Sequence, residues 1–324
     1  MPLGSPAGMS TCAVTAAFHQ SSSLRRGRKE KRVSVPHSEL PISALVPLEI
    51  RFPPEARNLD QDEEYFEVLL NGSWQRLRLH DYDALYRVPG LYETLVYRKL
   101  RCKSPERVVD LLAKVLEDWP TCMGDLRVLD FGAGNGVVAA HLRRQGVGYI
   151  VGADLLAEAE RAAQRDRPGA YDRYVVGDIT ALPAPRWDVL NTAHLNCLVT
   201  VAALGYGDIP AEAFRVAFNL VDDHGWIAFT LKETFLGGRD ETGFSGLIRG
   251  MIGSDILRVE AYHRYCHRRS IDGKKLFYVA MVGRKMRPMT DDEFVAALAD
   301  DTRSIESTRA PVLGSFKARG EPSP

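Results

Sequence analysis

Residues 128–136 are the part of this chain best suited to chemistry. They form an apolar segment with Asp130 at its end and then a turn with glycine at alternate positions, Gly132, Gly134 and Gly136. Glycine tolerates positive φ and lets a ligand come close to the backbone, because it has no Cβ. A helix pattern starts directly after Gly136, and the unpaired N–H groups of a helix start attract anions. The turn is therefore predicted to hold a small ligand that carries a negative group.

Further apolar segments follow, and two of them also end in an acid. Residues 149–154 end in Asp154, one helix and a turn after the glycines, and residues 174–179 contain Asp178. A carboxylate at the end of a second strand can accept hydrogen bonds from two ribose hydroxyls. Either acid alone is more often a helix cap, but the repeated order favours a shared binding edge. Residues 187–192, which include Asn191, are predicted to form the fourth strand of the same sheet.

The glycine spacing separates two kinds of nucleotide site. The dinucleotide fingerprint G-x-G-x-x-G would require a third glycine at position 137, where the chain has Val137. The order acid, hydrophobic, G-x-G-x-G, which begins at Asp130, resembles motif I of the class I S-adenosylmethionine-dependent methyltransferases. The resemblance covers about residues 105–285. It implies S-adenosyl-L-methionine as cofactor and methyl transfer by in-line displacement to an O, N or C atom of a small molecule.

The resemblance also implies a role for each strand end. The glycine turn would wrap the methionine part of the cofactor, Asp154 would bind its ribose, and Asp178 would bind the exocyclic amine of its adenine. The cofactor-binding residues expected on this basis are Asp130, Gly132, Ala133, Gly134, Asn135, Gly136, Asp154, Leu155, Asp178, Ile179 and Asn191. No metal ligand is expected.

The site of the methyl acceptor is less well defined by the sequence. The candidates follow the fourth expected strand and are Asn191, Thr192, His194 and Asn196. His194 is a candidate general base because imidazole titrates near neutral pH, whereas a loop histidine that binds backbone is the plainer alternative. His263 and His267 stand four apart in a strand pattern, which would place both on one face, and we expect that face to be the surface. The glycine-rich residues 234–255 form either a wall of the acceptor pocket or a surface insertion.

The fold class that these patterns predict is α/β, with a Rossmann-like, doubly wound and mostly parallel sheet closed by an antiparallel C-terminal hairpin. A β-hairpin around Asn71-Gly72 and a helical lead-in precede it. The lead-in holds tyrosines at 82, 86, 92 and 97 that either cover the cofactor or only pack on the core, and Ser104 is expected to cap the next helix. The expected segments are a disordered basic tail (1–50), the hairpin and lead-in (58–103), the methyltransferase domain (104–285), a short helix (286–302) and a disordered tail (303–324).

Composition argues against several other classes. The 324 residues carry 42 basic and 42 acidic side chains, so no overall charge favours duplex nucleic acid. The five cysteines include no C-x-x-C pair, which disfavours a zinc or iron–sulfur site and fits a reducing compartment. No apolar run approaches the ~20 residues that span a bilayer, and no secretory signal is recognisable. We expect a cytoplasmic enzyme with a small-molecule acceptor and no membrane partner, in an oligomeric state that stays open.

Two alternatives remain at this point. One is a scaffold or regulatory protein that binds the cofactor without turnover. The other is an NAD(P)-dependent oxidoreductase, which Val137 and the terminal hairpin disfavour.

Overall fold

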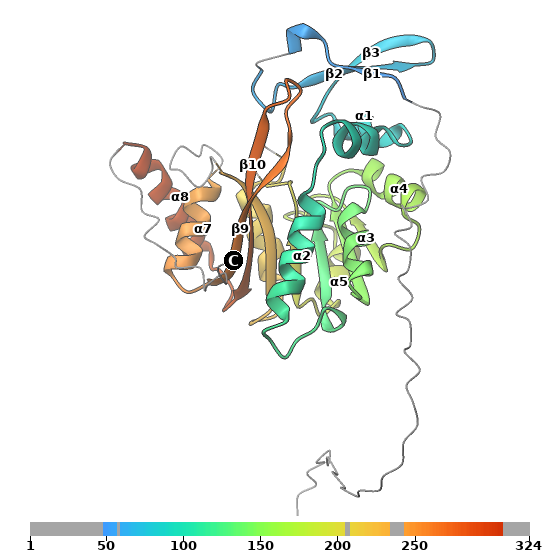
Figure 1. Cartoon of the computed structure of the whole chain (residues 1–324). Coiled ribbons are helices and arrows are strands. Elements are labelled where there is room, and N and C mark those ends of the chain that lie inside the picture. Colours follow the sequence, from blue (N-terminus) through green and yellow to red (C-terminus); the bar gives the residue numbers. More distant parts are fainter. Residues whose placement is uncertain (1–47, 57–58, 205–207, 234–242, 307–324) are drawn as a thin grey trace, which may run out of the picture. The chain divides into compact units, whose positions relative to one another are not determined.

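Seven apolar segments pair into the central sheet, in the order β6-β5-β4-β7-β8-β10-β9. Figure 1 shows the long hairpin of β9 and β10 reaching from this sheet toward β2. The structure is a computed structural model that describes residues 48–56, 59–204, 208–233 and 243–306, with side chains to residue 299. The strands are β4 (Arg127–Phe131), β5 (Tyr149–Asp154), β6 (Arg173–Val176), β7 (Cys197–Thr200), β8 (Trp226–Lys232), β9 (Leu257–Arg269) and β10 (Lys275–Lys285). Strands β4 to β8 pair in parallel, and β10 lies antiparallel to both β8 and β9. The predicted α/β fold with a closing hairpin is confirmed.

Alternate residues of the strands pack on opposite faces of this sheet, as the period of a strand requires. On one face, Val128 and Val199 pack with α2 (Ser104–Leu116) and α3 (Val137–Arg144). On the other face, Leu129 and Leu198 pack with the apolar sides of the remaining large helices. These helices are α6 (Ala211–Asn219), α7 (Phe244–Gly253) and α8 (Asp291–Glu306). Helix α4 (Ala157–Asp166) follows β5 and lies next to the lead-in.

A second, smaller sheet precedes this domain and consists of β1 (Ile50–Arg51), β2 (Tyr65–Leu70) and β3 (Ser73–Arg78), all antiparallel. The turn between β2 and β3 falls at Asn71-Gly72, as predicted, and both of these residues have positive φ. The short helix α1 (Tyr82–Arg87) and a π-helix (Glu93–Lys99) lead from this sheet to α2. Phe66, Leu85 and Leu95 share one apolar cluster with Ile271, which lies in the turn between β9 and β10. The small sheet, the lead-in and the β9–β10 turn are therefore packed together.

Two expectations need correction. Residues 187–192 are not a strand but belong to α5 (Ala184–Asn191), because Pro183 and Pro185 favour a helix start and the apolar residues there only imitate a strand run. The true fourth parallel strand is β7. The predicted disordered tail, residues 1–50, is too long, because Ile50 belongs to β1 and pairs with Val68 of β2. The rest of that tail, most of the C-terminal tail and residues 234–242 lie outside the described residues.

The end of the chain also differs in detail. Helix α8 runs from Asp291 to Glu306, beyond the expected limit at residue 302. Within the described part of the glycine-rich segment, residues 244–253 form α7, which is largely buried and packs against α8. No helix within the described ranges is long and apolar enough to cross a membrane.

Candidate functional site

The glycine turn after β4 has the backbone that its sequence predicts. Gly132, Gly134 and Gly136 have φ of 76°, 52° and 84°, in the region where other residues are strained. A Cβ at Gly134 would lie 2.6 Å from the Tyr86 hydroxyl oxygen, so the turn also needs glycine for space. Gly136 ends the turn as the N-cap of α3. The positive φ and the close approach of Tyr86 together explain why glycine stands at 134.

Asp154, at the end of β5, holds the turn in place. Its Oδ2 accepts a hydrogen bond of 2.9 Å from the Gly134 N–H, and its Oδ1 accepts one of 3.0 Å from the Leu156 N–H. Each carboxylate oxygen has two lone pairs, so both can still accept a bond from a ligand hydroxyl. Burial raises the pKa of this carboxyl group. Leu155 beside it is 63% exposed.

Two cavities meet at this edge of the sheet. The strand-end cavity has a volume of about 430 Å³, within the range of ~300–1,000 Å³ common for small-molecule sites. Its lining includes Asp154, Leu155, Asp178 and Ile179, from the ends of β5 and β6. The hairpin-side cavity is smaller, about 80 Å³, and is lined by residues 132–135 and by side chains of the lead-in and of β9 and β10. Gly132 and Tyr86 line both cavities, which are therefore adjacent.

Asp178 is exposed at the strand-end cavity. Its Oδ1 accepts hydrogen bonds from the Thr180 N–H and the Thr180 hydroxyl, at 2.9 and 2.7 Å. These bonds lower the pKa of the Asp178 carboxyl group. Ile179 next to it is buried and offers an apolar surface to a flat ring.

Two predicted binding residues support the turn instead of lining a cavity. Asp130 is fully buried, and its Oδ2 accepts a hydrogen bond of 2.7 Å from the Tyr171 hydroxyl. Burial raises the pKa of Asp130 to about 7. A Cβ at Gly136 would meet the Tyr171 ring at 3.2 Å, so that side chain also fills the space beside Gly136. The expected direct contacts of Asp130 and Gly136 with a cofactor are therefore corrected to an indirect, structural role.

The candidates around the expected fourth strand lie at the wrong edge of the sheet. Asn191 ends α5, and His194 is an exposed residue with φ of 49° in the turn before β7. Asn196 accepts a hydrogen bond of 2.7 Å from the N–H of Arg127, which is the first residue of β4, so this edge holds the amino ends of the strands. Neither Asn191 nor His194 lines the two cavities. Both site predictions fail because the strand was placed about ten residues too early.

The tyrosines of the lead-in lie against the glycine turn. The Tyr86 ring stacks with the Tyr82 ring, with centroids 6.2 Å apart, and is tilted against the Tyr92 ring, with centroids 5.0 Å apart. The Tyr92 and Tyr97 rings meet edge to face, with centroids 5.9 Å apart. All four line the hairpin-side cavity, and burial raises the pKa of each hydroxyl. They therefore form an aromatic wall opposite residues 132–135.

A polar cluster fixes this wall to the turn. Glu93 of the lead-in accepts hydrogen bonds from the side chain of Asn135 and from Arg167, the latter at 2.9 Å. Arg167 also donates to the Asn135 carbonyl oxygen at 2.9 Å. The side chains of Glu93 and Arg167 are only 12% and 7% exposed. Separating the partners of a buried ion pair leaves an uncompensated charge and is strongly destabilising. This pair therefore ties the lead-in to the turn, and the two are expected to move as one unit.

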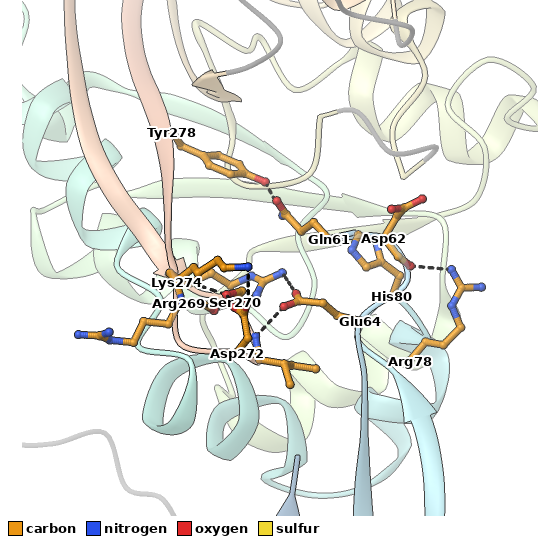
Figure 2. Close-up of polar contacts among 12 residues, drawn as sticks. Gln61, Asp62, Glu64, Arg78, His80, Arg269, Ser270, Asp272, Lys274 and Tyr278 are labelled. Carbon is orange, nitrogen blue, oxygen red and sulfur yellow. Dashed lines mark hydrogen bonds and ion pairs between the residues drawn. The ribbon is translucent and has the colours of Figure 1, made fainter. Parts of the chain in front are cut away.

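The β9–β10 hairpin contributes residues that the sequence analysis missed. His267 was expected at the surface beside His263, but it is 5% exposed and lines the hairpin-side cavity, whereas His263 is exposed. Figure 2 shows how the hairpin meets the segment before β2: the Gln61 amide donates to the Tyr278 hydroxyl at 2.9 Å. Arg268 donates to Glu64 at 2.7 Å, and both of these side chains are buried.

Acidic and basic groups also meet on the other side of this cavity. His80 lies 3.4 Å from the Asp208 carboxylate, measured from Nδ1 to Oδ2, and the Tyr82 hydroxyl lies 3.5 Å from the same oxygen. His80, Tyr82 and Asp208 line both cavities. Among the described residues, no group of three or more His, Cys, Asp or Glu side chains is arranged to hold a metal ion.

Comparisons with known proteins agree with this geometry. Residues 97–243 match a protein family described as a methyltransferase domain. No curated protein matches the chain significantly by sequence.

Solved structures with a similar fold include the N-methyltransferase NodS from Bradyrhizobium japonicum in complex with S-adenosyl-L-homocysteine (15% identity, 63% of this chain, 96% of that chain, TM-score 0.43). Others are a SAM-dependent methyltransferase from Anabaena variabilis (14% identity, 64% and 96%, TM-score 0.41) and a ribosomal protein L11 methylase from Lactobacillus delbrueckii (15% identity, 56% and 78%, TM-score 0.36). These likenesses do not identify the acceptor. Residues 97–243 therefore carry a methyltransferase domain, and its glycine turn after the first strand of a parallel sheet fits S-adenosyl-L-methionine as methyl donor.

Proposed function

We propose that this enzyme transfers the methyl group of S-adenosyl-L-methionine to a small molecule bound in the hairpin-side cavity. The observation that carries the proposal is the position of the lead-in. Tyr82, Tyr86 and Tyr92 stand over the glycine turn, and the cavity beside the turn is bounded on its far side by β9 and β10. A space walled on several sides by side chains suits a small acceptor better than a folded RNA or protein.

The residues present fit the cofactor. Residues 132–135 line the cavity and let the methionine part come close to the backbone, and Asp154 has lone pairs left for the two ribose hydroxyls. Asp178 and Ile179 supply an acceptor and an apolar surface for its adenine. When bound, the cofactor supplies an activated methyl group, and the chain's own task is to orient the acceptor and exclude water. The cysteine pattern supports a reducing compartment such as the cytoplasm as its location.

A labelling experiment tests the proposal. The full chain is incubated with methyl-labelled S-adenosylmethionine and, separately, with the small-molecule, RNA and protein fractions of a cell extract. We expect label only in the small-molecule fraction, with calorimetric binding of S-adenosylmethionine and none of NAD. Label confined to RNA or protein would overturn the small-molecule proposal. Binding without transfer to any fraction would support the scaffold alternative instead.

A further inference from the structure

His267 stands at a β-bulge and lines the hairpin-side cavity. In the pairing of β9 with β10, Cys266 opposes Phe277 and Arg268 opposes Leu276, so His267 is an extra residue without a partner across the strands. Bulges bend a strand and re-aim a side chain, and they are frequent next to active sites. Here the bulge also frees the His267 carbonyl, which accepts a hydrogen bond of 2.9 Å from the N–H of Lys103. This hydrogen bond fixes the backbone of His267 against the start of α2.

The His267 ring has one nitrogen engaged by the protein. Its Nδ1 lies 2.6 Å from the Ser104 Oγ, and the Ser104 Oγ lies 2.6 Å from the Tyr265 hydroxyl. Tyr265 in turn bonds to Thr230, whose Oγ1 accepts the N–H of Ala202 at 2.7 Å. This chain of hydrogen bonds joins α2, β9 and β8 to the loop after β7, where Ala202 lines both cavities. The ring plane is fixed by stacking on Tyr278, with centroids 4.1 Å apart.

We propose that His267 contacts the methyl acceptor through Nε2 and accepts the proton that the acceptor loses on methylation. The side chain lines the cavity, and the described residues give Nε2 no hydrogen-bond partner, so this nitrogen is left for a ligand. The tautomer required has its proton on Nδ1, donated to Ser104, which leaves the lone pair on Nε2. The inference rests on the proposed function, because it assumes an acceptor in this cavity.

The proton and electron balance is simple. The acceptor's hydroxyl oxygen forms a bond to the methyl carbon with its own electron pair, and the carbon–sulfur bond of the donor breaks with its pair retained by sulfur. The hydroxyl proton passes to Nε2, which gives an imidazolium whose Nδ1–H remains bonded to Ser104. Ser104 is then a positioning residue, since it orients the ring without touching the acceptor.

The groups around the ring keep it neutral. Burial, and to a smaller degree the Arg268 guanidinium, lower the pKa of His267 well below its usual range. The other titratable groups facing it are Cys102 before α2, with its Sγ 3.7 Å from Nδ1, Tyr265 on β9 and Tyr278 on β10. Burial raises the pKa of Cys102 and of Tyr278, the latter to about 12, so both are neutral near pH 7. The charge of Arg268 is balanced by Glu64.

The cavity walls indicate the acceptor's class. The aromatic rings of Tyr82, Tyr86, Tyr92, Tyr97 and Tyr278 line it, and such walls favour a flat aromatic molecule. A base is useful only if the acceptor atom still carries its proton at neutral pH. We therefore infer an aromatic ring with a hydroxyl group, a phenol, as the acceptor.

The first test does not depend on turnover. The protein is labelled with ¹⁵N in its eight histidines, and the His267 ring signals are assigned by their loss in the full-length His267→Gln variant. We expect a protonated Nδ1 and an unprotonated Nε2 that stay unchanged on acidification to about pH 6, well above the lowered pKa of this ring. A protonated Nε2 in the neutral ring would overturn the proposal.

The second test compares two phenols at about pH 8. 4-Methylphenol keeps its proton there, like a tyrosine side chain with a pKa of about 10, whereas 4-nitrophenol is largely ionised. We expect His267→Gln to lower kcat with 4-methylphenol at least tenfold and to change kcat with 4-nitrophenol much less. His263→Gln, an exposed histidine on the same strand, is the matched control and should behave like the parent.

The outcomes separate the two proposals. Equal losses with both phenols would show that His267 is only structural and would overturn the inference. Transfer to other small molecules of the extract, but to neither phenol, would overturn the inferred acceptor class while leaving the proposed function intact. Absence of transfer to any small molecule would instead be a failure of the proposed function.

Discussion

The backbone N–H of Gly134 donates a hydrogen bond of 2.9 Å to the Oδ2 of Asp154. This bond joins the turn after β4 to the end of β5, two elements that the sequence separates by a helix. It means that the acid expected to bind the ribose also sets the shape of the glycine turn. Losing the carboxylate should therefore affect two parts of the cofactor site at once.

Asp154→Ala is expected to weaken S-adenosylmethionine binding more than tenfold. The variant loses the acceptor for the ribose hydroxyls, and hydrogen bonds to charged groups contribute about 1.5–3 kcal/mol each. Calorimetric titration of the folded variant measures the change in Kd. Asp255→Ala, which removes an exposed acid outside the cavities, is the control. Parent-like affinity in Asp154→Ala would show that the residue is only a helix cap.

Gly134→Ala should destabilise the fold and should do so partly through Tyr86. The new Cβ would lie 2.6 Å from the Tyr86 hydroxyl oxygen, and the positive φ costs about 1–2 kcal/mol by itself. Tyr86→Phe removes the nearest contact, since the next ring atom is 3.4 Å away. Denaturant unfolding of the parent, both single variants and the double variant should give a double-variant loss smaller than the sum of the single losses. Strict additivity would mean that Tyr86 does not press on the turn.

Much of the fold was predictable from local patterns, and the failures have identifiable causes. The strands around Asp130, Asp154 and Asp178 were located because each is a buried apolar run next to an acid. Residues 187–192 were misplaced because an apolar run of this length fits a strand or a helix equally well, and only Pro183 and Pro185 pointed to a helix. The error moved the expected acceptor site to the opposite edge of the sheet.

The hairpin side of the site was beyond prediction from periodicity. Strand alternation puts His263 and His267 on one face, and Tyr265 between them bonds the same Ser104 hydroxyl as His267. Cys102 and Ser104 cover the His267 end of that face, whereas His263 stays exposed. The partners of His267 and Arg268 come from Ser104 and Glu64, more than 160 residues earlier in the chain. Ser104 itself was predicted to be a helix cap, whereas its hydroxyl bonds His267 and Tyr265 and the N-cap is Lys103.

Asp130→Asn is expected to change how stability depends on pH. Asp130 has a pKa of about 7 in the folded protein, against about 3.9 in an unfolded chain, so between these values the folded state holds a proton that unfolding releases. The free energy of unfolding of the parent should therefore fall as pH rises from about 4 to about 7 and then level off. The asparagine still accepts the Tyr171 hydroxyl bond but does not titrate.

The measurement is urea unfolding of parent and variant at several pH values. The variant should gain stability relative to the parent, by up to a few kcal/mol, as pH rises through this window. Only the difference between the two proteins is used, because burial also raises the pKa of Asp154 in both. A difference that is constant with pH would show that Asp130 is ionised in the folded protein at all these values.

Glu64→Gln should loosen the contact between the small sheet and the β9–β10 hairpin. Glu64 accepts hydrogen bonds from Arg268 at 2.7 Å and from the Ile271 N–H at 2.6 Å, and it is 2% exposed (Figure 2). Removing one partner of a buried ion pair leaves an uncompensated charge and typically costs about 3–5 kcal/mol. The double variant Glu64→Gln/Arg268→Met removes both charges and should be more stable than Glu64→Gln alone.

Glu233→Gln is the matched control. Its partner Arg264 lies on β9 like Arg268, but the Glu233–Arg264 pair is exposed, so little change is expected. Thermal unfolding of the four proteins checks the order, and a double variant less stable than Glu64→Gln would contradict the assignment of the cost to the unpaired Arg268 charge.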